Sequence, residues 1–189
     1  DPPPVPDPPA PEDSGDALIE AGIHLFGRDG FFSVQIADIV KEAGYSVGTF
    51  YKRFESKERF LAEIVYRIGR RTRHYLTEYA TGRGTRLDRE ILGMWNFLAY
   101  FGRHPKYYTI VREAEFVVPQ AVKEYYNAFE RGYVHSLTMY PEQRRTLPAN
   151  FLMGISHYLG IEVLFSDRVD DARDLVERIG RLIGEGIDV

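Results

Sequence analysis

The chain has 189 residues, of which 44% are hydrophobic and 14% aromatic, and it contains no cysteine. This composition supplies enough apolar side chains for a packed core and excludes a disordered chain, while the lack of cysteine excludes a disulfide framework and thiolate metal sites. The net charge of −4 is unevenly distributed. Residues 1–16 hold five acids and no base, which leaves +1 for the rest, and residues 52–73 hold eight bases against three acids, a local excess of +5. Local basic clusters of this kind attract phosphates whatever the overall charge.

The first 15 residues contain seven prolines and show no hydrophobic periodicity. Their composition predicts a disordered, Pro-rich acidic tail, because such segments cannot bury enough apolar surface to fold. The tail lacks the basic start and apolar stretch of a signal peptide, and no apolar run approaches the roughly 18 residues that cross a bilayer. Together with the absence of cysteine, these features predict a cytoplasmic protein without a membrane partner.

From Asp16 onward, apolar residues recur at helical spacing and no period-two alternation appears, so we predict an all-α fold. Glycine and serine mark helix ends: Gly30 and Gly44 stop helices, and Ser46 is suited to cap one. Pro105, Pro119 and Pro148 suit the first turn of later helices. The predicted helices cover about nine ranges: 16–28, 34–43, 47–54, 56–79, 87–102, 105–116, 119–139, 148–165 and 169–187.

Residues 36–51 have the pattern of a helix-turn-helix: a helix of about two turns, a break at Gly44, then a second short helix. Ala43 is small where the two helices cross, and Gly48, without a side chain, would let the backbone of the second helix approach a phosphate or base edge. A second helix placed in the major groove of DNA would present a set of hydroxyls and cations to the duplex. That set comprises Thr49, Tyr51, Lys52, Arg53 and Lys57.

The combined pattern resembles the N-terminal region of the TetR family of regulators over about residues 17–65. The matching residues are Ala21, Leu25-Phe26, Gly30, Ala43-Gly44, Gly48-Thr49-Phe50-Tyr51, Phe54 and Ser56-Lys57-Glu58. The resemblance implies that Thr49, Tyr51 and Lys57 contact phosphates and that Val47 and Gly48 face the groove. It also implies a homodimer on a palindromic operator and release by a small-molecule effector. The chain departs from the family by placing Gln35 where members often have Ser or Thr, and acids where members often have a basic arm.

These inferences define a domain organisation and a DNA site. We predict a helix-turn-helix DNA-binding domain over residues 16–60 and an effector-binding and dimerisation domain over residues 61–189. Arg70, Arg71 and Arg73 lie about 20 Å along the fourth helix from Lys57, at 1.5 Å per residue, so we leave them out of the site. The predicted DNA contacts are Gln35, Val47, Gly48, Thr49, Tyr51, Lys52, Arg53 and Lys57.

The C-terminal region carries no enzyme signature: it has no Gly-rich phosphate loop, no nucleophile elbow and no paired histidines at metal-binding spacing. We therefore predict no catalysis, no cofactor and no metal. Its high aromatic content fits either an aromatic core or a cavity for a hydrophobic or aromatic effector. Glu113 or Glu115, if it faced that cavity, would favour a cationic effector. The predicted ligand-binding residues are Trp95, Tyr108, Val111, Tyr125, Phe129 and Tyr158.

The helix predicted over 148–165 is apolar on more faces than one neighbour can cover, and the last predicted helix has a matching apolar stripe. This pattern fits either intrachain packing or a two-fold four-helix bundle between subunits. We favour the bundle, because a palindromic operator requires a dimer. The predicted interface residues are Phe151, Ile155, Leu159, Val163, Leu175, Ile179 and Leu182.

The sequence as a whole predicts a DNA-binding transcriptional regulator, a repressor released from double-stranded operator DNA by a small hydrophobic or aromatic effector. An alternative is a ligand-independent or activating DNA-binding protein. A third hypothesis, an enzyme or transport-type binding protein with a vestigial DNA head, is disfavoured by the intact Gly48-Thr49-Phe50-Tyr51 motif and Lys57.

Overall fold

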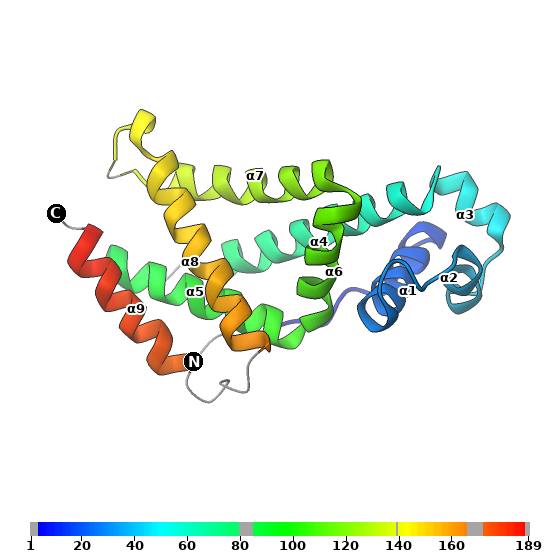
Figure 1. The fold of residues 1–189 in the computed structure, drawn as a ribbon, viewed down its shortest axis with the longest axis horizontal. Helices are drawn as coiled ribbons and strands as arrows, with labels where there is room; N and C mark the ends of the chain where they lie inside the picture. Colours follow the sequence, from blue (N-terminus) through cyan, green and yellow to red (C-terminus); the bar gives the residue numbers. More distant parts are fainter. Residues whose placement is uncertain (1–3, 80–84, 139, 166–171, 188–189) are drawn as a thin grey trace. The chain divides into compact units, whose positions relative to one another are not determined.

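The computed structural model describes residues 4–79, 85–138, 140–165 and 172–187, and over these ranges the chain is helical without any strand (Figure 1). The all-α prediction is confirmed, and every predicted helix is present, with ends within three residues of those expected wherever the structure describes them; the predicted start of the last helix at residue 169 lies outside the described residues. The one element not predicted is a 3₁₀ turn, η1 (Glu142–Arg144). The helices are α1 (Ser14–Asp29), α2 (Ile36–Ala43), α3 (Val47–Arg53), α4 (Lys57–Tyr79), α5 (Arg86–Arg103), α6 (Pro105–Val117), α7 (Pro119–Ser136), α8 (Thr146–Phe165) and α9 (Ala172–Ile187).

The start of α1 lies inside the segment predicted as a tail. The Asp13 carboxylate accepts hydrogen bonds from the backbone N–H groups of Gly15 and Asp16, at 2.7 and 2.9 Å, and so caps the helix. These two bonds, the one from Asp16 first, outweigh desolvation and lower the pKa of Asp13. The predicted boundary at residue 15 is therefore corrected to residue 12. Residues 4–12 have no regular secondary structure.

The chain divides into two compact units. The head unit comprises residues 6–70 and 104–128, and the body unit comprises residues 4–5 with the described residues of 71–103 and 129–187. The division differs from the predicted domains, because residues 61–70 of α4, all of α6 and the start of α7 group with the helix-turn-helix.

The core of the head unit is built around Phe60 at the start of α4. Its ring is fully buried and meets the rings of Phe26, Phe50 and Phe54 at centroid distances of 6.0, 5.0 and 4.7 Å. Helix α1 approaches closely because Gly22 faces this ring: a Cβ at Gly22 would lie 2.5 Å from Phe60. Phe50, on α3, is completely buried in the same core.

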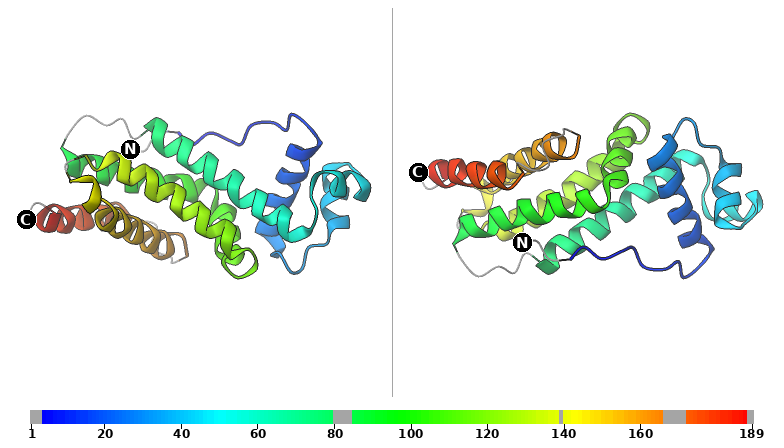
Figure 2. Two further views of the ribbon diagram at one scale, coloured as in Figure 1. Left: turned by 90° about the horizontal axis from the view of Figure 1, so that it is seen from above. Right: turned by 90° about the horizontal axis from the view of Figure 1, so that it is seen from below.

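In the body unit α5 packs against both α8 and α9, and both views in Figure 2 show these two helices on the same side of α5. Gly180 on α9 allows the close contact with α5, since a Cβ there would lie 2.6 Å from the Ile91 side chain. The buried residues of this core are Met94, Leu98, Leu137, Ala149, Leu152, Leu159, Val163, Val176 and Ile183.

Candidate nucleic-acid interface

A glycine in the left-handed backbone conformation connects α2 to the turn before α3. Gly44 has φ 75° and ψ 28°, a conformation that costs glycine little and other residues more. The N–H of Gly44 donates to Lys41 O, and the N–H of Tyr45 donates to Val40 O at 2.8 Å. These bonds satisfy the last carbonyls of α2 and turn the chain towards α3.

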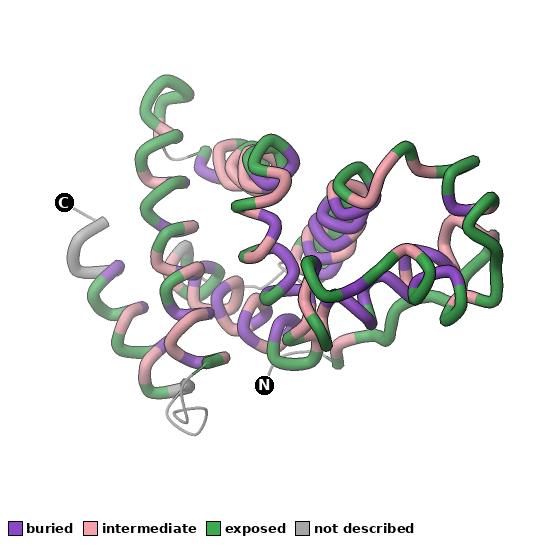
Figure 3. The backbone as a smooth tube through the Cα atoms, turned by 45° about the vertical axis from the view of Figure 1, so that its right-hand side comes forward, coloured by how far each residue is buried: buried purple, intermediate pink, exposed green. Residues whose placement is uncertain are grey.

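Helix α3 begins at a serine cap and presents one face outward. Ser46 Oγ accepts a hydrogen bond from the backbone N–H of Thr49 at 3.2 Å. Phe50 anchors the inner face, while Val47 and Tyr51 are 45% and 55% exposed. Figure 3 shows the exposed stretch that runs through α3 and the turn before it. The outward face of this helix is therefore open to a partner.

Gly48 lies on this open face, and no contact with the described part of the chain requires a glycine there. A Cβ built on Gly48 would meet only Ser46 Oγ, at 3.7 Å, which is an ordinary van der Waals contact. The residue is helical, so a positive φ does not explain it either. Glycine is a poor helix former, so its presence in a seven-residue helix is a cost to local stability. An external surface that must approach this backbone would account for it.

Gln35 and Thr49, two of the predicted DNA contacts, differ in how far their side chains are exposed. Gln35 is exposed at the start of α2, and its backbone N–H donates to Asp38 Oδ2 at 2.9 Å. Thr49 is half-buried, and its hydroxyl shares a hydrogen bond with Ser46 Oγ at 3.1 Å. The Gln35 side chain is thus accessible at the end of α2, whereas the Thr49 hydroxyl already has a partner.

Lys57, a predicted phosphate contact, is directed into the head unit. Its Nζ donates to the backbone carbonyl of Val34 at 2.7 Å and lies 4.2 Å from the centroid of the Phe31 ring. Desolvation in this half-buried position lowers the pKa of Lys57. The lysine fixes the loop between α1 and α2 instead of standing free to meet a phosphate.

The basic excess of residues 52–73 is also partly neutralised within the head unit. Arg53 donates to Asp13 Oδ2 at 3.0 Å and to Ser14 Oγ at 3.3 Å, so a predicted DNA-contacting cation is bound to the cap of α1. Arg67 forms an ion pair with Asp16 at 2.8 Å. Lys52 is exposed on α3. The pairings of Arg53 and Arg67 with acidic side chains reduce the positive charge that the head unit presents near α3.

Two exposed aromatic residues, one in the turn before α3 and one in the loop before α2, were not predicted from the sequence as part of the site. Tyr45, in the turn before α3, is 43% exposed, and Phe32, in the loop before α2, is 72% exposed. Tyr45 directly precedes the capping Ser46, a position that could have marked it as a neighbour of the recognition helix.

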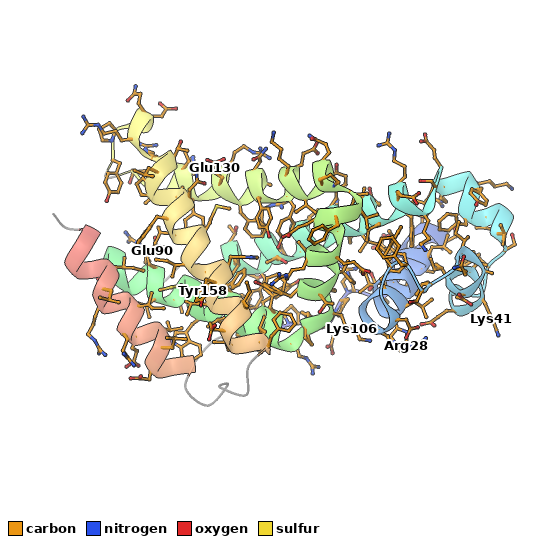
Figure 4. All side chains as sticks on the ribbon, viewed as in Figure 1. Arg28, Lys41, Glu90, Lys106, Glu130 and Tyr158 are labelled. Carbon is orange, nitrogen blue, oxygen red and sulfur yellow. The ribbon has the colours of Figure 1, made fainter. Side chains whose placement is uncertain are left out.

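A carboxylate from α6 holds the loop that leads into α2. The backbone N–H of Phe31 donates to Glu113 Oε2 at 2.8 Å, across 82 positions of sequence. Helix α6 packs directly on α1, where a Cβ at Gly27 would lie 2.5 Å from the Lys106 side chain. Figure 4 labels Lys106 and Arg28 close together at this α1–α6 contact. Glu113 thus ties α6 to the loop that leads into the helix-turn-helix.

The predicted ligand-binding residues are distributed over the two units. Tyr108, Val111 and Tyr125 are buried in the head unit, where burial raises the pKa of Tyr108 to about 12. Near them, the Tyr126 hydroxyl donates to Glu115 Oε1 at 3.2 Å.

Trp95 and Phe129 are half-buried in the body unit, and Arg73 lies 5.6 Å from the Phe129 ring centroid. Tyr158, labelled on α8 in Figure 4, is 63% exposed, which corrects its expected place in a cavity of the protomer.

Helix α8 carries a row of exposed apolar side chains at helical spacing, here called the α8 stripe: Leu147, Phe151, Tyr158 and Phe165. Leu182 on α9 is also exposed, and Ile155, Leu175 and Ile179 are half-buried.

Leu159 and Val163, by contrast, are 1% and 5% exposed within the body core. This burial corrects their expected place at a dimer interface, because a residue already covered has no surface to offer a second chain.

Within the described ranges the structure contains no group of three His, Asp or Glu side chains arranged to hold a metal ion. In the same ranges, no helix combines the length and the apolar character that a membrane span requires.

Comparisons with known proteins agree with the geometry of the head unit. Residues 18–64 match the family model of the bacterial regulatory proteins of the tetR family. Over 61 residues the chain is 38% identical to an uncharacterised HTH-type transcriptional regulator, YdgC, of Bacillus subtilis (strain 168). That match covers 32% of this chain and 31% of the curated relative, so less than a third of the relative's length is matched.

Solved structures extend the likeness of fold over most of the chain. A TetR-family regulator from Syntrophomonas wolfei superposes with a TM-score of 0.74 at 16% identity, covering 89% of this chain and 93% of that one. The regulator FadR of Bacillus subtilis, solved in complex with stearoyl-CoA, superposes with a TM-score of 0.71 at 16% identity, covering 88% and 95%. At such low identity these similarities establish the fold alone.

Proposed function

We propose that the chain, whose residues 18–64 match the family model of the bacterial regulatory proteins of the tetR family, is a repressor that binds a palindromic operator as a homodimer and is released by a small molecule. The observation that carries the DNA-binding part is the outward face of α3, with exposed Val47, Gly48 and Tyr51 beside exposed Lys52. A short helix of this kind fits the major groove, where apolar and hydroxyl side chains meet base edges and phosphates.

The roles of the individual residues follow from their exposure and chemistry. Val47 is positioned to read base edges by apolar contact, and the Tyr51 hydroxyl and Lys52 ammonium to meet phosphates. The side-chain amide of Gln35, at the start of α2, can donate a hydrogen bond to a phosphate of the DNA backbone. Arg53 would join these contacts only by leaving Asp13.

Selection of duplexes from a random-sequence library tests this proposal directly. We expect enrichment of a palindrome whose half-sites lie about one helical turn apart, or a multiple of it, as two-fold helix-turn-helix dimers require. Enrichment of no duplex over random DNA at moderate salt would refute the DNA-binding proposal. Transcription in vitro from a promoter that carries the selected site would then separate a repressor from the alternative, an activating or ligand-independent DNA-binding protein.

Gly48→Ala separates DNA binding from folding. The extra methyl group has room in the protein and improves helix propensity, so we expect the free energy of unfolding to stay equal or to rise by up to about 1 kcal/mol. The same methyl group would stand between α3 and the DNA, so we expect at least a tenfold loss of operator affinity in gel-shift titrations. Gly132→Ala, at an exposed α7 position with no neighbour within 4 Å of the added Cβ, is the matched control. Equal operator affinity of Gly48→Ala and wild type would show that DNA does not approach this backbone.

The α8 stripe supports the homodimer. Four large apolar side chains exposed on one helix exceed the scattered apolar residues of an ordinary surface, and such patches mark interaction sites. Leu182 on α9 extends the apolar surface of the body unit. We assign Tyr158 to this interface, with Phe151, and not to an effector cavity.

For the effector part, the fold of a regulator that binds stearoyl-CoA is similar to this one, which supports an effector with a large apolar part. The signal has a direct path within the head unit, since α6 packs on α1 and Glu113 holds the N–H of Phe31. An effector that moves α6 would shift this hydrogen bond and with it the entrance to α2, which changes the population of DNA-competent heads.

Glu113→Ala tests this link. Loss of a charge-assisted hydrogen bond, worth about 1.5–3 kcal/mol, should loosen the loop before α2 and weaken operator binding by about tenfold without effector. Glu115→Ala is the control, because Glu115 accepts from Tyr126 and does not contact the loop. Gel-shift titration of both variants against the selected palindrome provides the measurement. Identical affinities of the two variants would remove Glu113 from the signalling path.

A further inference from the structure

Asn96, on α5, carries a buried acceptor without a hydrogen-bond partner. The side chain is fully buried, and its Nδ2 donates to the backbone carbonyl of Tyr79 at 3.1 Å. Its Oδ1 has no partner within the described part of the chain. Turning the amide over does not remove the problem, because the Tyr79 carbonyl requires a donor and only Nδ2 can supply one.

Aromatic rings surround this part of the body unit. Tyr100 lies one helical turn beyond Asn96, and Tyr75 lies one turn before Tyr79. The Tyr75 ring lies 5.0 Å from that of Tyr100 and 4.9 Å from that of Tyr79. Tyr75 and Tyr100 are buried, and Trp95, next to Asn96, is half-buried. The unpaired acceptor therefore lies at an α4–α5 contact that is rich in rings.

A polar atom kept unpaired inside a protein costs stability, and proteins pair nearly all such atoms. An apolar residue of similar size would fill the position without that cost. The asparagine is explained if an outside group completes its hydrogen bonding. That group must be a donor, because a carbonyl oxygen only accepts.

We propose that Asn96 is the polar anchor of an effector site in the body unit, where its Oδ1 accepts a hydrogen bond from the O–H or N–H group of an aromatic ligand. The inference rests on the proposed effector function and specifies its chemistry: an aromatic body packs on the tyrosine rings, and one donor group fixes its orientation. Sites that pair a buried polar group with a ligand donor reject analogues that lack the donor.

Two matched pairs of small probes test the donor requirement: indole against 1-methylindole, and phenol against anisole. In each pair a methyl group removes the donor and leaves the ring. We expect wild-type protein to bind the donor member at least tenfold more tightly in calorimetric titrations. Trp95 is the only tryptophan in the chain, so its single indole N–H resonance reports binding next to Asn96 and should shift with the donor probes.

Asn96→Leu keeps the size of the side chain and removes the acceptor, so the ratio of affinities within each pair should fall to about one. Asn127→Leu, on α7 of the head unit, should keep the wild-type ratio. The wild-type comparison stands by itself if Asn96→Leu fails to fold. Equal affinities within both pairs, a ratio unchanged in Asn96→Leu, or a Trp95 resonance that does not move would each overturn the proposal. So would a crystal structure in which a water molecule donates to Oδ1 in the presence of indole.

The readout is independent of DNA. Donor-selective probe binding that leaves the operator complex intact would support the Asn96 site and refute release by an effector at this site. Loss of operator binding in Gly48→Ala should leave the probe affinities unchanged, which keeps the two proposals separable.

Discussion

Phe60→Ala is expected to unfold the head unit and abolish operator binding. The ring is fully buried at the meeting point of Phe26, Phe50 and Phe54, and truncating such a residue costs about 3–5 kcal/mol. That loss is comparable to the whole free energy of unfolding of a small domain. Chemical denaturation followed by circular dichroism should show a shifted or lost first transition, and gel shifts should show no complex.

The matched control for this variant is Phe32→Ala, which removes the same ring from a position that is 72% exposed. Its free energy of unfolding should stay within about 0.5 kcal/mol of wild type. If the two alanine variants were equally stable, Phe60 would not hold the head unit together as its contacts indicate.

Phe151→Lys is expected to convert the protein to a monomer and to reduce operator affinity by about hundredfold or more. The side chain is 53% exposed in the protomer, so the change should leave the fold of each chain intact. In a dimer built on the α8 stripe, the lysine would be buried without a partner, which strongly disfavours association. A monomer also loses the gain of about 10²–10⁴ that comes from binding two half-sites together.

Sedimentation and gel-shift titrations at matched concentrations would measure both effects. Asn150→Lys adds the same charge at an exposed position next to Phe151, turned about 100° around α8. We expect it to remain dimeric. A dimeric Phe151→Lys protein with wild-type affinity would place the interface elsewhere.

Helix ends could be read from the sequence because the signals that set them are local. Gly44 adopts the left-handed conformation that its place after α2 predicted, and Ser46 caps α3 as expected. Val47, Gly48 and Tyr51, which the family resemblance placed towards DNA, are exposed on α3.

Contacts between distant segments left no such signal. The family resemblance makes Lys57 a phosphate contact, and its local sequence does not reveal that its side chain reaches the carbonyl of Val34 and the ring of Phe31. The backbone N–H of Phe31 donates to Glu113, which lies 82 positions away in the sequence. The sequence alone could not show which of the two nearby acids, Glu113 or Glu115, makes this contact.

Helix α8 shows a different limit. It is apolar on most faces, so its periodicity could not tell which residues face the body core and which face outward. Leu159 and Tyr158 are adjacent in sequence, yet the first is buried and the second exposed. The packing of α8 on α5 decides which face of α8 is turned towards the core, and only the tertiary structure reveals that packing.

The ion pair between Arg53 and Asp13 bears on how operator affinity responds to salt. A cation that meets a phosphate strengthens binding because condensed counterions leave the DNA and enter bulk solution. Arg53 is already paired with the carboxylate of Asp13. If Arg53 moved to a DNA phosphate, it would replace one anionic partner by another, and the carboxylate of Asp13 would then attract a cation from solution. If the chain binds an operator as proposed, Asp13 would act as an internal counterion of Arg53, and we expect operator affinity to depend less steeply on salt than the number of basic residues near α3 suggests.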